Sequence, residues 1–139
     1  MYELRPYQTE AIEAINEHWQ DWQRELLVLP TGCGKTVLFN EIARQKAPGV
    51  LILAHRDELI EQARQKYGGE TGKIKAEENS ILDVTVGSVQ TMCRRNYNAD
   101  LFSTVIVDEA HHAVSPSYQA ILKQFPDAKV LGVTATADS

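Results

Sequence analysis

Short apolar runs alternate with stretches of helical periodicity along this chain, and that alternation restricts its fold more than any other feature. Each run holds a few apolar or β-branched residues, and most are followed by segments in which apolar residues recur at helical spacing. Such runs are typical of strands buried on both faces. We therefore predict a three-layer α/β domain with a mainly parallel central sheet flanked by helices. Strands are expected at residues 26–29, 50–54, 83–87, 104–107 and 130–134, and helices at 7–23, 35–45, 57–67 and 118–125.

The size of the chain fits one domain, which we place at residues 1–139. No run approaches the roughly 18 apolar residues that span a membrane, and the polar N-terminus lacks a signal-peptide core. We expect a cytoplasmic protein with no membrane partner. The two cysteines, Cys33 and Cys93, lie far apart without clustered histidines, so we expect reduced thiols and no zinc site.

The charge balance gives no support for a nucleic-acid partner. The formal net charge is −5, whereas a strongly basic chain would indicate binding to a polyanion. A local basic groove remains compatible with this balance. Any nucleic-acid role must therefore be inferred from motifs.

A glycine-rich loop follows the first apolar run, at the end of a strand where α/β sheets place their ligands. Gly32 and Gly34 allow a tight loop whose N–H groups can face phosphate oxygens. Lys35 can reach the β and γ phosphates of a nucleotide, and Thr36 can place its hydroxyl on Mg²⁺. Leu29 replaces the first glycine of the strict G-x-x-x-x-G-K-[ST] pattern. The alternative is a glycine-rich turn with an incidental lysine.

Two carboxylates follow the fourth run, at Asp108 and Glu109. A magnesium nucleotide needs a carboxylate near its metal, which suits Asp108, and Glu109 is then the candidate base for the attacking water. Because neighbouring residues of a strand point to opposite faces, both can serve one site only if the strand ends at Asp108. The alternative is an acidic loop after a core strand.

These segments resemble the motifs of superfamily 2 helicases, in that family's order and over nearly the whole chain. Asp108-Glu109-Ala110-His111 resembles the DEAH form of motif II, and the loop through Thr36 resembles motif I, which commonly lacks the first glycine. Further similarities are Leu4–Gln8 to the adenine-reading motif, Ala54–Leu59 with Gln62 to motif Ia, Gly87–Thr91 to the segment before motif II, and Thr134–Thr136 to motif III. The resemblance is closest to the branch with DNA-repair helicases and type I restriction motor subunits.

The resemblance implies a role for each matching residue. ATP and Mg²⁺ are the implied cofactors, with Lys35 and Glu109 catalytic and with Thr36 and Asp108 holding the metal, partly through water. The implied nucleotide-binding residues are Arg5, Gln8, Thr31, Gly32, Cys33, Gly34, Lys35, Thr36 and Asp108. Contacts to a nucleic-acid backbone are implied for His55, Arg56, Ser88 and Gln90, and coupling to movement for His111, Thr134, Ala135 and Thr136.

Several of these residues have simpler interpretations. Gln8 can be an exposed helix residue, and Arg56 with Asp57 can form a solvated helix start. Ser88 and Thr91 can cap the next helix instead of contacting nucleic acid. Trp19 and Trp22 are expected to pack in the core and not to stack on bases.

The family works with two RecA-like domains, and this chain matches the first, the helicase ATP-binding domain. A second domain, in the same or another chain, is the expected partner, because it supplies the arginines that stabilise phosphoryl transfer. The predicted function is the ATP-binding half of a helicase or translocase on single- or double-stranded nucleic acid, with DNA expected over RNA. The alternatives are a nucleotide-binding module without turnover and an unrelated P-loop ATPase.

Overall fold

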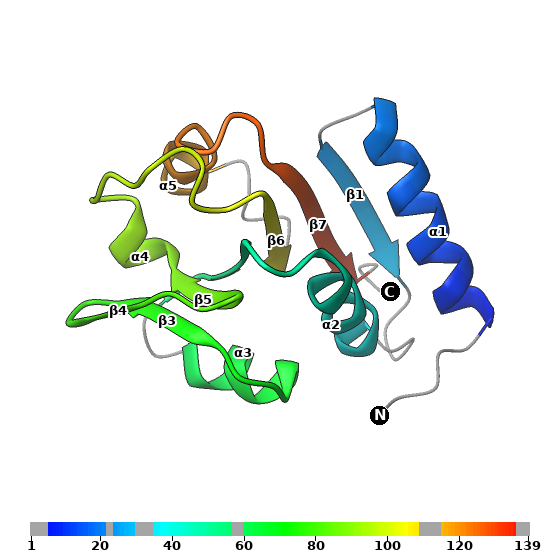
Figure 1. The fold of residues 1–139 in the computed structure, drawn as a ribbon, viewed down its shortest axis with the longest axis horizontal. Coiled ribbons are helices and arrows are strands. Elements are labelled where there is room, and N and C mark those ends of the chain that lie inside the picture. The colour runs from blue at the N-terminus through cyan, green and yellow to red at the C-terminus, as the bar shows by residue number, and fades with distance from the viewer. Residues whose placement is uncertain (1–5, 22–23, 30–34, 57–59, 109–114, 136–139) are drawn as a thin grey trace.

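The central element of the fold is a seven-stranded sheet in the order β1-β7-β6-β2-β5-β3-β4 (Figure 1). The computed structural model describes residues 6–21, 24–29, 35–56, 60–108 and 115–135. Among the pairs that it describes, only β3 and β4 run antiparallel. The strands are β1 (Arg24–Leu29), β2 (Val50–Ala54), β3 (Gly72–Lys75), β4 (Glu78–Ser80), β5 (Val84–Ser88), β6 (Thr104–Asp108) and β7 (Lys129–Ala135).

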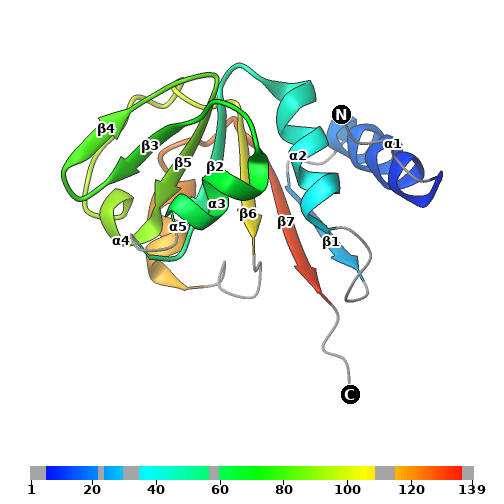
Figure 2. The same ribbon diagram turned by 90° about the horizontal axis from the view of Figure 1, so that it is seen from below.

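Helices cover both faces of this sheet and complete the three predicted layers (Figure 2). One face packs against α1 (Pro6–Asp21), α2 (Lys35–Lys46) and α3 (Ile60–Tyr67). The other face packs against α4 (Val89–Met92) and α5 (Pro116–Leu122). No helix in the described part of the chain is long and apolar enough to cross a membrane.

The strand β2 shows why the apolar runs are unbroken. Its five residues are all buried. Val50, Ile52 and Ala54 join the core under α1, α2 and α3, whereas Leu51 and Leu53 join the core under α4 and α5. Because successive side chains point to opposite faces, a strand between two helical layers favours apolar residues on both faces, and β2 has one at every position.

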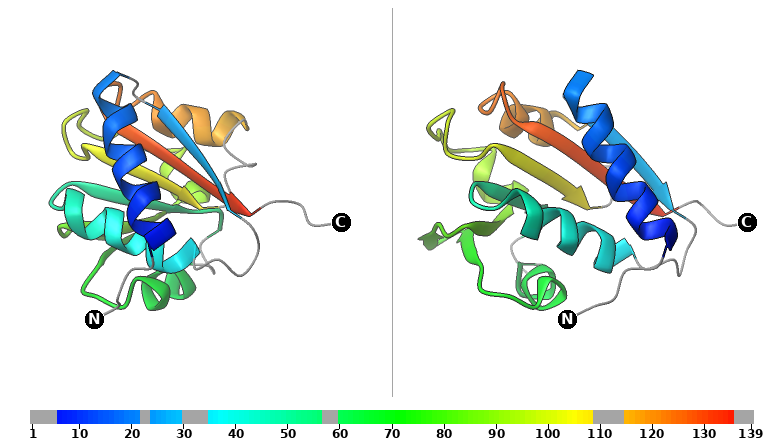
Figure 3. Two further views of the ribbon diagram at one scale, coloured as in Figure 1. Left: turned by 90° about the vertical axis from the view of Figure 1, so that its right-hand side faces the viewer. Right: turned by 45° about the vertical axis from the view of Figure 1, so that its right-hand side comes forward.

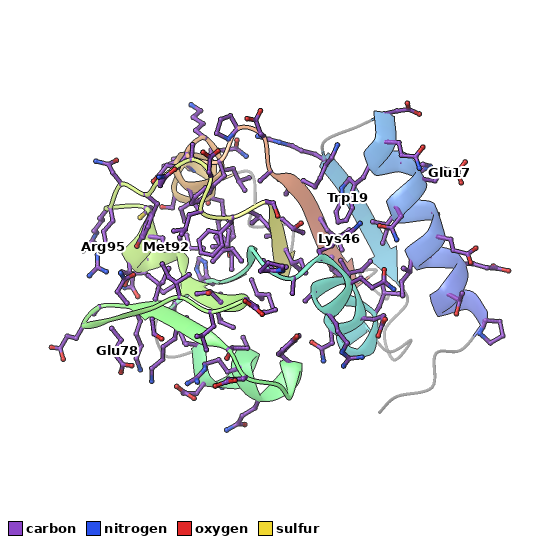
Figure 4. The ribbon with its side chains drawn as sticks, viewed as in Figure 1. Glu17, Trp19, Lys46, Glu78, Met92 and Arg95 are labelled. Atoms are coloured by element: carbon purple, nitrogen blue, oxygen red, sulfur yellow. The ribbon has the colours of Figure 1, made fainter. Side chains whose placement is uncertain are left out.

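The end of α1 is fixed to the start of β7. The Trp19 indole N–H donates to the backbone oxygen of Val130 at 3.4 Å, and the Lys129 ammonium donates to the backbone oxygen of Trp19. The Lys46 ammonium lies 5.4 Å from the centre of the Trp19 ring (Figure 4). Trp19 is 4% exposed, which confirms the prediction that it packs in the core. Trp22 lies outside the described residues. Figure 3 shows α1 running alongside β1 at this edge of the sheet.

The predicted strands and helices are all present, the strand at 50–54 with the predicted bounds and the others with shifted ends. The helix expected at 118–125 begins at Pro116, because the Ser115 hydroxyl accepts from the Tyr118 N–H as an N-cap, and it ends at Leu122. The helix expected at 57–67 is described from Ile60 onward.

The hairpin of β3 and β4 lies in the segment for which the sequence predicts no structure. In β3 only Ile74 joins a core cluster, so an edge pair of this kind lacks an apolar signature. Gly72 is needed there, since a Cβ would lie 2.2 Å from the backbone oxygen of Ser80. The packing of the hairpin thus depends on a position where no side chain fits.

Candidate functional site

The parallel strands bring the predicted site residues to one edge of the sheet, which we call the carboxyl edge. Along this edge the strands β1, β7, β6, β2 and β5 end in turn (Figure 1). Ligands of open α/β sheets bind beyond this edge. The predicted phosphate-binding residues come after β1, the predicted metal carboxylate ends β6, and predicted coupling residues end β7. The residues predicted for nucleic acid lie at or just after the ends of β2 and β5.

The helix α2 begins at Lys35, so Lys35 and Thr36 occupy its first turn. The first N–H groups of a helix lack partners within it, and they carry the positive end of the helix dipole. Leu38, Ile42 and Ala43 hold α2 against the sheet with at most a trace of exposure. This arrangement presents an anion-binding helix end at the carboxyl edge. The loop residues Thr31, Gly32, Cys33 and Gly34 lie outside the described residues.

The strand β6 ends at Asp108, as the pairing of two neighbouring carboxylates in one site requires. Asp108 lies opposite Val133 of β7. Glu109, Ala110 and His111 lie outside the described residues.

The end of β7 lies between the ends of β1 and β6. Thr134 and Ala135 are its last two residues, and they lie opposite Val28 and Leu29 of β1. Of the predicted coupling residues, Thr134 and Ala135 therefore lie on the strand between β1, which precedes the predicted phosphate loop, and β6, which ends at Asp108. Thr136 lies outside the described residues.

The helix α1 carries Gln8 in its first turn. Because the far end of α1 is bonded to the start of β7, its first turn lies toward the carboxyl edge. Arg5 lies outside the described residues.

His55 and Arg56 follow β2 directly, and both are exposed. The His55 ring stacks on the ring of Tyr118 with the centroids 6.2 Å apart and the planes 10° apart. Tyr118 itself is 1% exposed and belongs to the core under α5. A buried aromatic ring thus supports a polar side chain at the carboxyl edge. Asp57, the alternative capping residue, lies outside the described residues.

Ser88 ends β5 and Gln90 lies just after it, and the two residues differ in exposure. The buried Ser88 hydroxyl accepts from the Thr91 N–H at 3.3 Å and caps α4, which is the simpler of the two interpretations of this residue. Gln90 is exposed on α4. Of the two, Gln90 has the side chain that solvent and ligands can reach.

An ion-pair network fixes the hairpin to α3. Lys73 lies 3.3 Å from a Glu61 oxygen and 2.8 Å from a Glu78 oxygen, and Arg64 lies 2.9 Å from Glu61. Hydrogen bonds from Arg64 and then Lys73 hold the pKa of Glu61 below its ordinary value of 4.5. Lys73 likewise lowers the pKa of Glu78, and Glu78, followed by Glu61, raises the pKa of Lys73 above 10.5. All three groups are charged near neutral pH.

Two arginines that the sequence interpretation missed extend the carboxyl edge beyond Gln90. Arg94 and Arg95 line a pocket of about 360 Å³ together with Ala76, Gln90 and Thr91. In the sequence, these two residues are visible as an Arg-Arg pair shortly after the segment 87–91. The pair alone does not indicate a pocket, because the hairpin that forms the opposite wall is not predicted from the sequence.

The strand order and the helix ends at the carboxyl edge define the class of protein as an α/β domain of the RecA-like type. The chain belongs to the ResIII family, described as "Type III restriction enzyme, res subunit", which matches residues 1–139.

Two curated relatives and one solved structure illustrate this membership. The chain is 37% identical over 162 residues to "Putative ATP-dependent helicase IRC3" of Saccharomyces cerevisiae, covering 96% of this chain and 23% of that protein. It is 32% identical to "DNA 3'-5' translocase XPB2" of Sulfurisphaera tokodaii, covering 98% of this chain and 31% of that protein. The UvsW helicase of bacteriophage T4 shares the fold, with a TM-score of 0.74 and 20% identity over 98% of this chain and 53% of that one.

These relatives place the domain among superfamily 2 helicases. The chain spans only about a quarter to a third of the length of the two curated relatives, at 23% and 31%.

Proposed function

We propose that this chain is the first motor domain, residues 1–139, of a protein that couples hydrolysis of Mg-ATP to movement on DNA. The observation that carries the proposal is the arrangement of the carboxyl edge. An anion-binding helix end and the strand of a candidate metal carboxylate occupy one part, and exposed polar side chains occupy the adjoining part. The relative XPB2, named as a DNA translocase, supports DNA as the substrate.

The nucleotide part would hold ATP and magnesium. The loop at residues 31–34, Lys35 and Thr36 would bind the phosphates, and Asp108 would hold Mg²⁺ partly through water. Oxygen donors from a hydroxyl and a carboxylate suit that hard cation. The bound ion would neutralise developing charge on the phosphates.

The reacting water and the base are assigned to the segment after β6. Glu109 would orient and deprotonate the attacking water, and His111 with Thr134, Ala135 and Thr136 would couple the nucleotide state to movement. The Asp108–His111 tetrapeptide supports the DEAH form of motif II for this segment. Gln8 and Arg5 would contact the adenine.

The nucleic-acid part would contact phosphates of the DNA backbone through His55, Arg56 and Gln90. Ser88 would act chiefly by capping α4 and so fixing Gln90, since its hydroxyl is buried in that role. A second RecA-like domain, in the same or another chain, would close the nucleotide site and supply the arginines that stabilise the transferring phosphoryl group.

Phosphate release from ATP tests the proposal, measured with and without single-stranded DNA on the wild type and on Glu109→Gln. Binding of a fluorescent ATP analogue is measured in parallel, with Lys35→Ala as its control. We expect the chain alone to bind Mg-ATP in a Lys35-dependent way and to turn it over slowly or not at all. Addition of a protein that carries the second domain should produce DNA-stimulated turnover that Glu109→Gln abolishes.

A nucleotide-binding module without turnover is the second candidate function. It would bind Mg-ATP through Lys35 yet show no DNA-stimulated turnover with any second domain supplied. Absence of Lys35-dependent ATP binding would contradict both candidates.

A further inference from the structure

A pocket between the hairpin and α4 carries two cationic side chains outside the residues assigned so far. Its lining residues within the described part of the chain are Ala76, Gln90, Thr91, Arg94 and Arg95, and among these are two arginines and no carboxylate. A volume of about 360 Å³ lies at the lower end of the range of about 300–1,000 Å³ that is usual for ligand pockets. The chain as a whole carries a formal charge of −5, so this concentration of positive charge is local.

Contacts from the hairpin and from the segment after α5 hold Arg95 in place. Its guanidinium donates from Nη2 to the backbone oxygen of Ala76 on the hairpin at 2.9 Å. Gln124 fixes the backbone on the other side, because its Nε2 donates to the oxygen of Arg95 at 2.8 Å and its Oε1 accepts from the N–H of Tyr97 at 2.7 Å. Figure 4 shows Arg95 beside α4 and the hairpin. A guanidinium has five N–H donors, so this single bond to Ala76 orients Arg95 and leaves further donors for a ligand.

Arg94 adds a second positive charge that the described residues do not neutralise. Its side chain is exposed, and within the described ranges it forms no ion pair. Of the two acidic residues on the adjoining hairpin, Glu78 on β4 is paired with Lys73 at 2.8 Å, and Glu77 on the turn is exposed outside the pocket lining. Two arginines and an amide in one pocket lining supply positive charge and N–H donors, which suit a phosphodiester with its hydrogen-bond-accepting oxygens and its single negative charge.

The position of the pocket indicates which kind of phosphate it would bind. Gln90 lies both in the pocket lining and in the proposed nucleic-acid part, so the pocket adjoins that part on the side of β3 and β4. We propose that Arg94 and Arg95 bind a backbone phosphate of single-stranded nucleic acid, beyond the phosphates contacted by His55, Arg56 and Gln90. This arginine pocket extends the proposed line of backbone contacts to the hairpin edge of the sheet. The inference rests on the proposed function.

The salt dependence of oligothymidylate binding to the full chain tests the arginine pocket. For single strands, each phosphate contact contributes about 0.7 to the slope of log affinity against log salt. We expect Arg94→Gln/Arg95→Gln to weaken binding by roughly tenfold or more, the loss typical of a hydrogen bond to a charged group, and to reduce the slope by about 0.7. Arg94→Lys/Arg95→Lys keeps the charge but loses the forks, so it should restore the slope and only part of the affinity. Gln124→Ala should weaken binding less than the double glutamine variant.

Matched control variants distinguish loss of the phosphate contact from a general loss of positive charge and from misfolding. Arg44→Gln removes an exposed arginine that is paired with Glu41 on α2 and should leave the affinity unchanged. Arg94→Gln alone alters an exposed side chain without bonds in the described residues, so it should leave the urea midpoint unchanged and report on the contact itself. An unchanged affinity and slope in the double glutamine variant, while Arg56→Gln weakens binding, would overturn the arginine pocket alone.

Two further outcomes separate this inference from the proposed function. A wild type that binds Mg-ATP but no oligothymidylate would overturn the proposed function together with this inference. Calorimetric titration with inorganic phosphate distinguishes a free anion from a nucleic-acid phosphate. Binding of phosphate that matches the oligothymidylate in strength and is lost in the double variant would identify a free-phosphate site and contradict the assignment.

Discussion

The two parts of the carboxyl edge are built in different ways. The nucleotide part follows β1, β7 and β6 and depends on a helix end, a loop and a strand-end carboxylate. The proposed nucleic-acid part follows β2 and β5, continues to the hairpin, and depends on exposed polar side chains supported by the buried Tyr118 and Ser88 and by the half-buried Gln124. The nucleotide part is therefore encoded in short local motifs, whereas the nucleic-acid part is assembled by the strand order.

Removal of the Lys35 ammonium should give the largest difference between the effect on ATP binding and the effect on DNA binding. Lys35→Ala should cost about 1.5–3 kcal/mol of ATP-binding free energy, the usual value of a hydrogen bond to a charged group, and leave DNA affinity unchanged. Titration of a fluorescent ATP analogue and of labelled DNA against the same preparation measures both. A parallel fall in DNA affinity would contradict the separation.

A side chain at Gly72 should damage only the nucleic-acid part. Because the Cβ of Gly72→Ala would lie 2.2 Å from the Ser80 oxygen, the hairpin backbone must shift, at a cost of about 1–3 kcal/mol in unfolding free energy. The hairpin carries Ala76, so DNA affinity should fall while ATP binding persists. Urea unfolding and the two titrations check this. Gly68→Ala, where no atom lies within 4 Å of the added Cβ but φ is +77°, controls for strain without a clash. Loss of ATP binding in the Gly72 variant would show that the two parts are not independent.

The cap at Ser88 should have a smaller effect. Ser88→Ala removes the acceptor for the Thr91 N–H and should lower the free energy of unfolding by about 1 kcal/mol. If Ser88 acts through α4 alone, DNA affinity should change only slightly below the unfolding transition. Ser80→Ala, at an exposed hydroxyl on β4, is the matched control. A loss of affinity as large as that of Arg56→Gln would mean that the Ser88 hydroxyl contacts the nucleic acid directly.

The smallest expected effect concerns the ion pairs that fix the hairpin to α3. The lowered pKa values of Glu61 and Glu78 mean that their contribution is present above their ordinary value of 4.5 and is lost as the pH falls through the folded-state values. The raised pKa of Lys73 means that its contribution is present below 10.5 and is lost as the pH rises through its folded-state value. Lys73→Gln should therefore lower the urea midpoint slightly at neutral pH, and the difference from wild type should shrink in acid. A difference that grows in acid would contradict the sign.

The fold could be predicted from the sequence where burial imposes a pattern. Strands between two helical layers favour apolar or β-branched residues on both faces, as in Val50–Ala54, and this pattern marks the predicted strands. The hairpin could not be predicted, because an edge pair with Ile74 as its one core residue leaves no such pattern.

The candidate site divides in the same way. The segment Gly34–Thr36 and the position of Asp108 at a strand end follow from local sequence. The stacking of His55 on Tyr118 and the meeting of Arg95 with Ala76 join distant segments, so only the tertiary structure brings them together.

The adjacency of β6 and β2 has a mechanical consequence. Val107 lies opposite Leu53, so the strand that ends at Asp108 and the strand that precedes His55 are hydrogen-bonded neighbours, about 4.8 Å apart. The proposed ATP site and the proposed DNA contacts therefore lie on one rigid sheet. Neither can move relative to the other without breaking hydrogen bonds between β6 and β2. A rigid sheet that holds both ligands at a constant separation cannot move along DNA by itself. In the proposed motor, movement along DNA must come from a change in distance between this sheet and a second domain that also binds DNA.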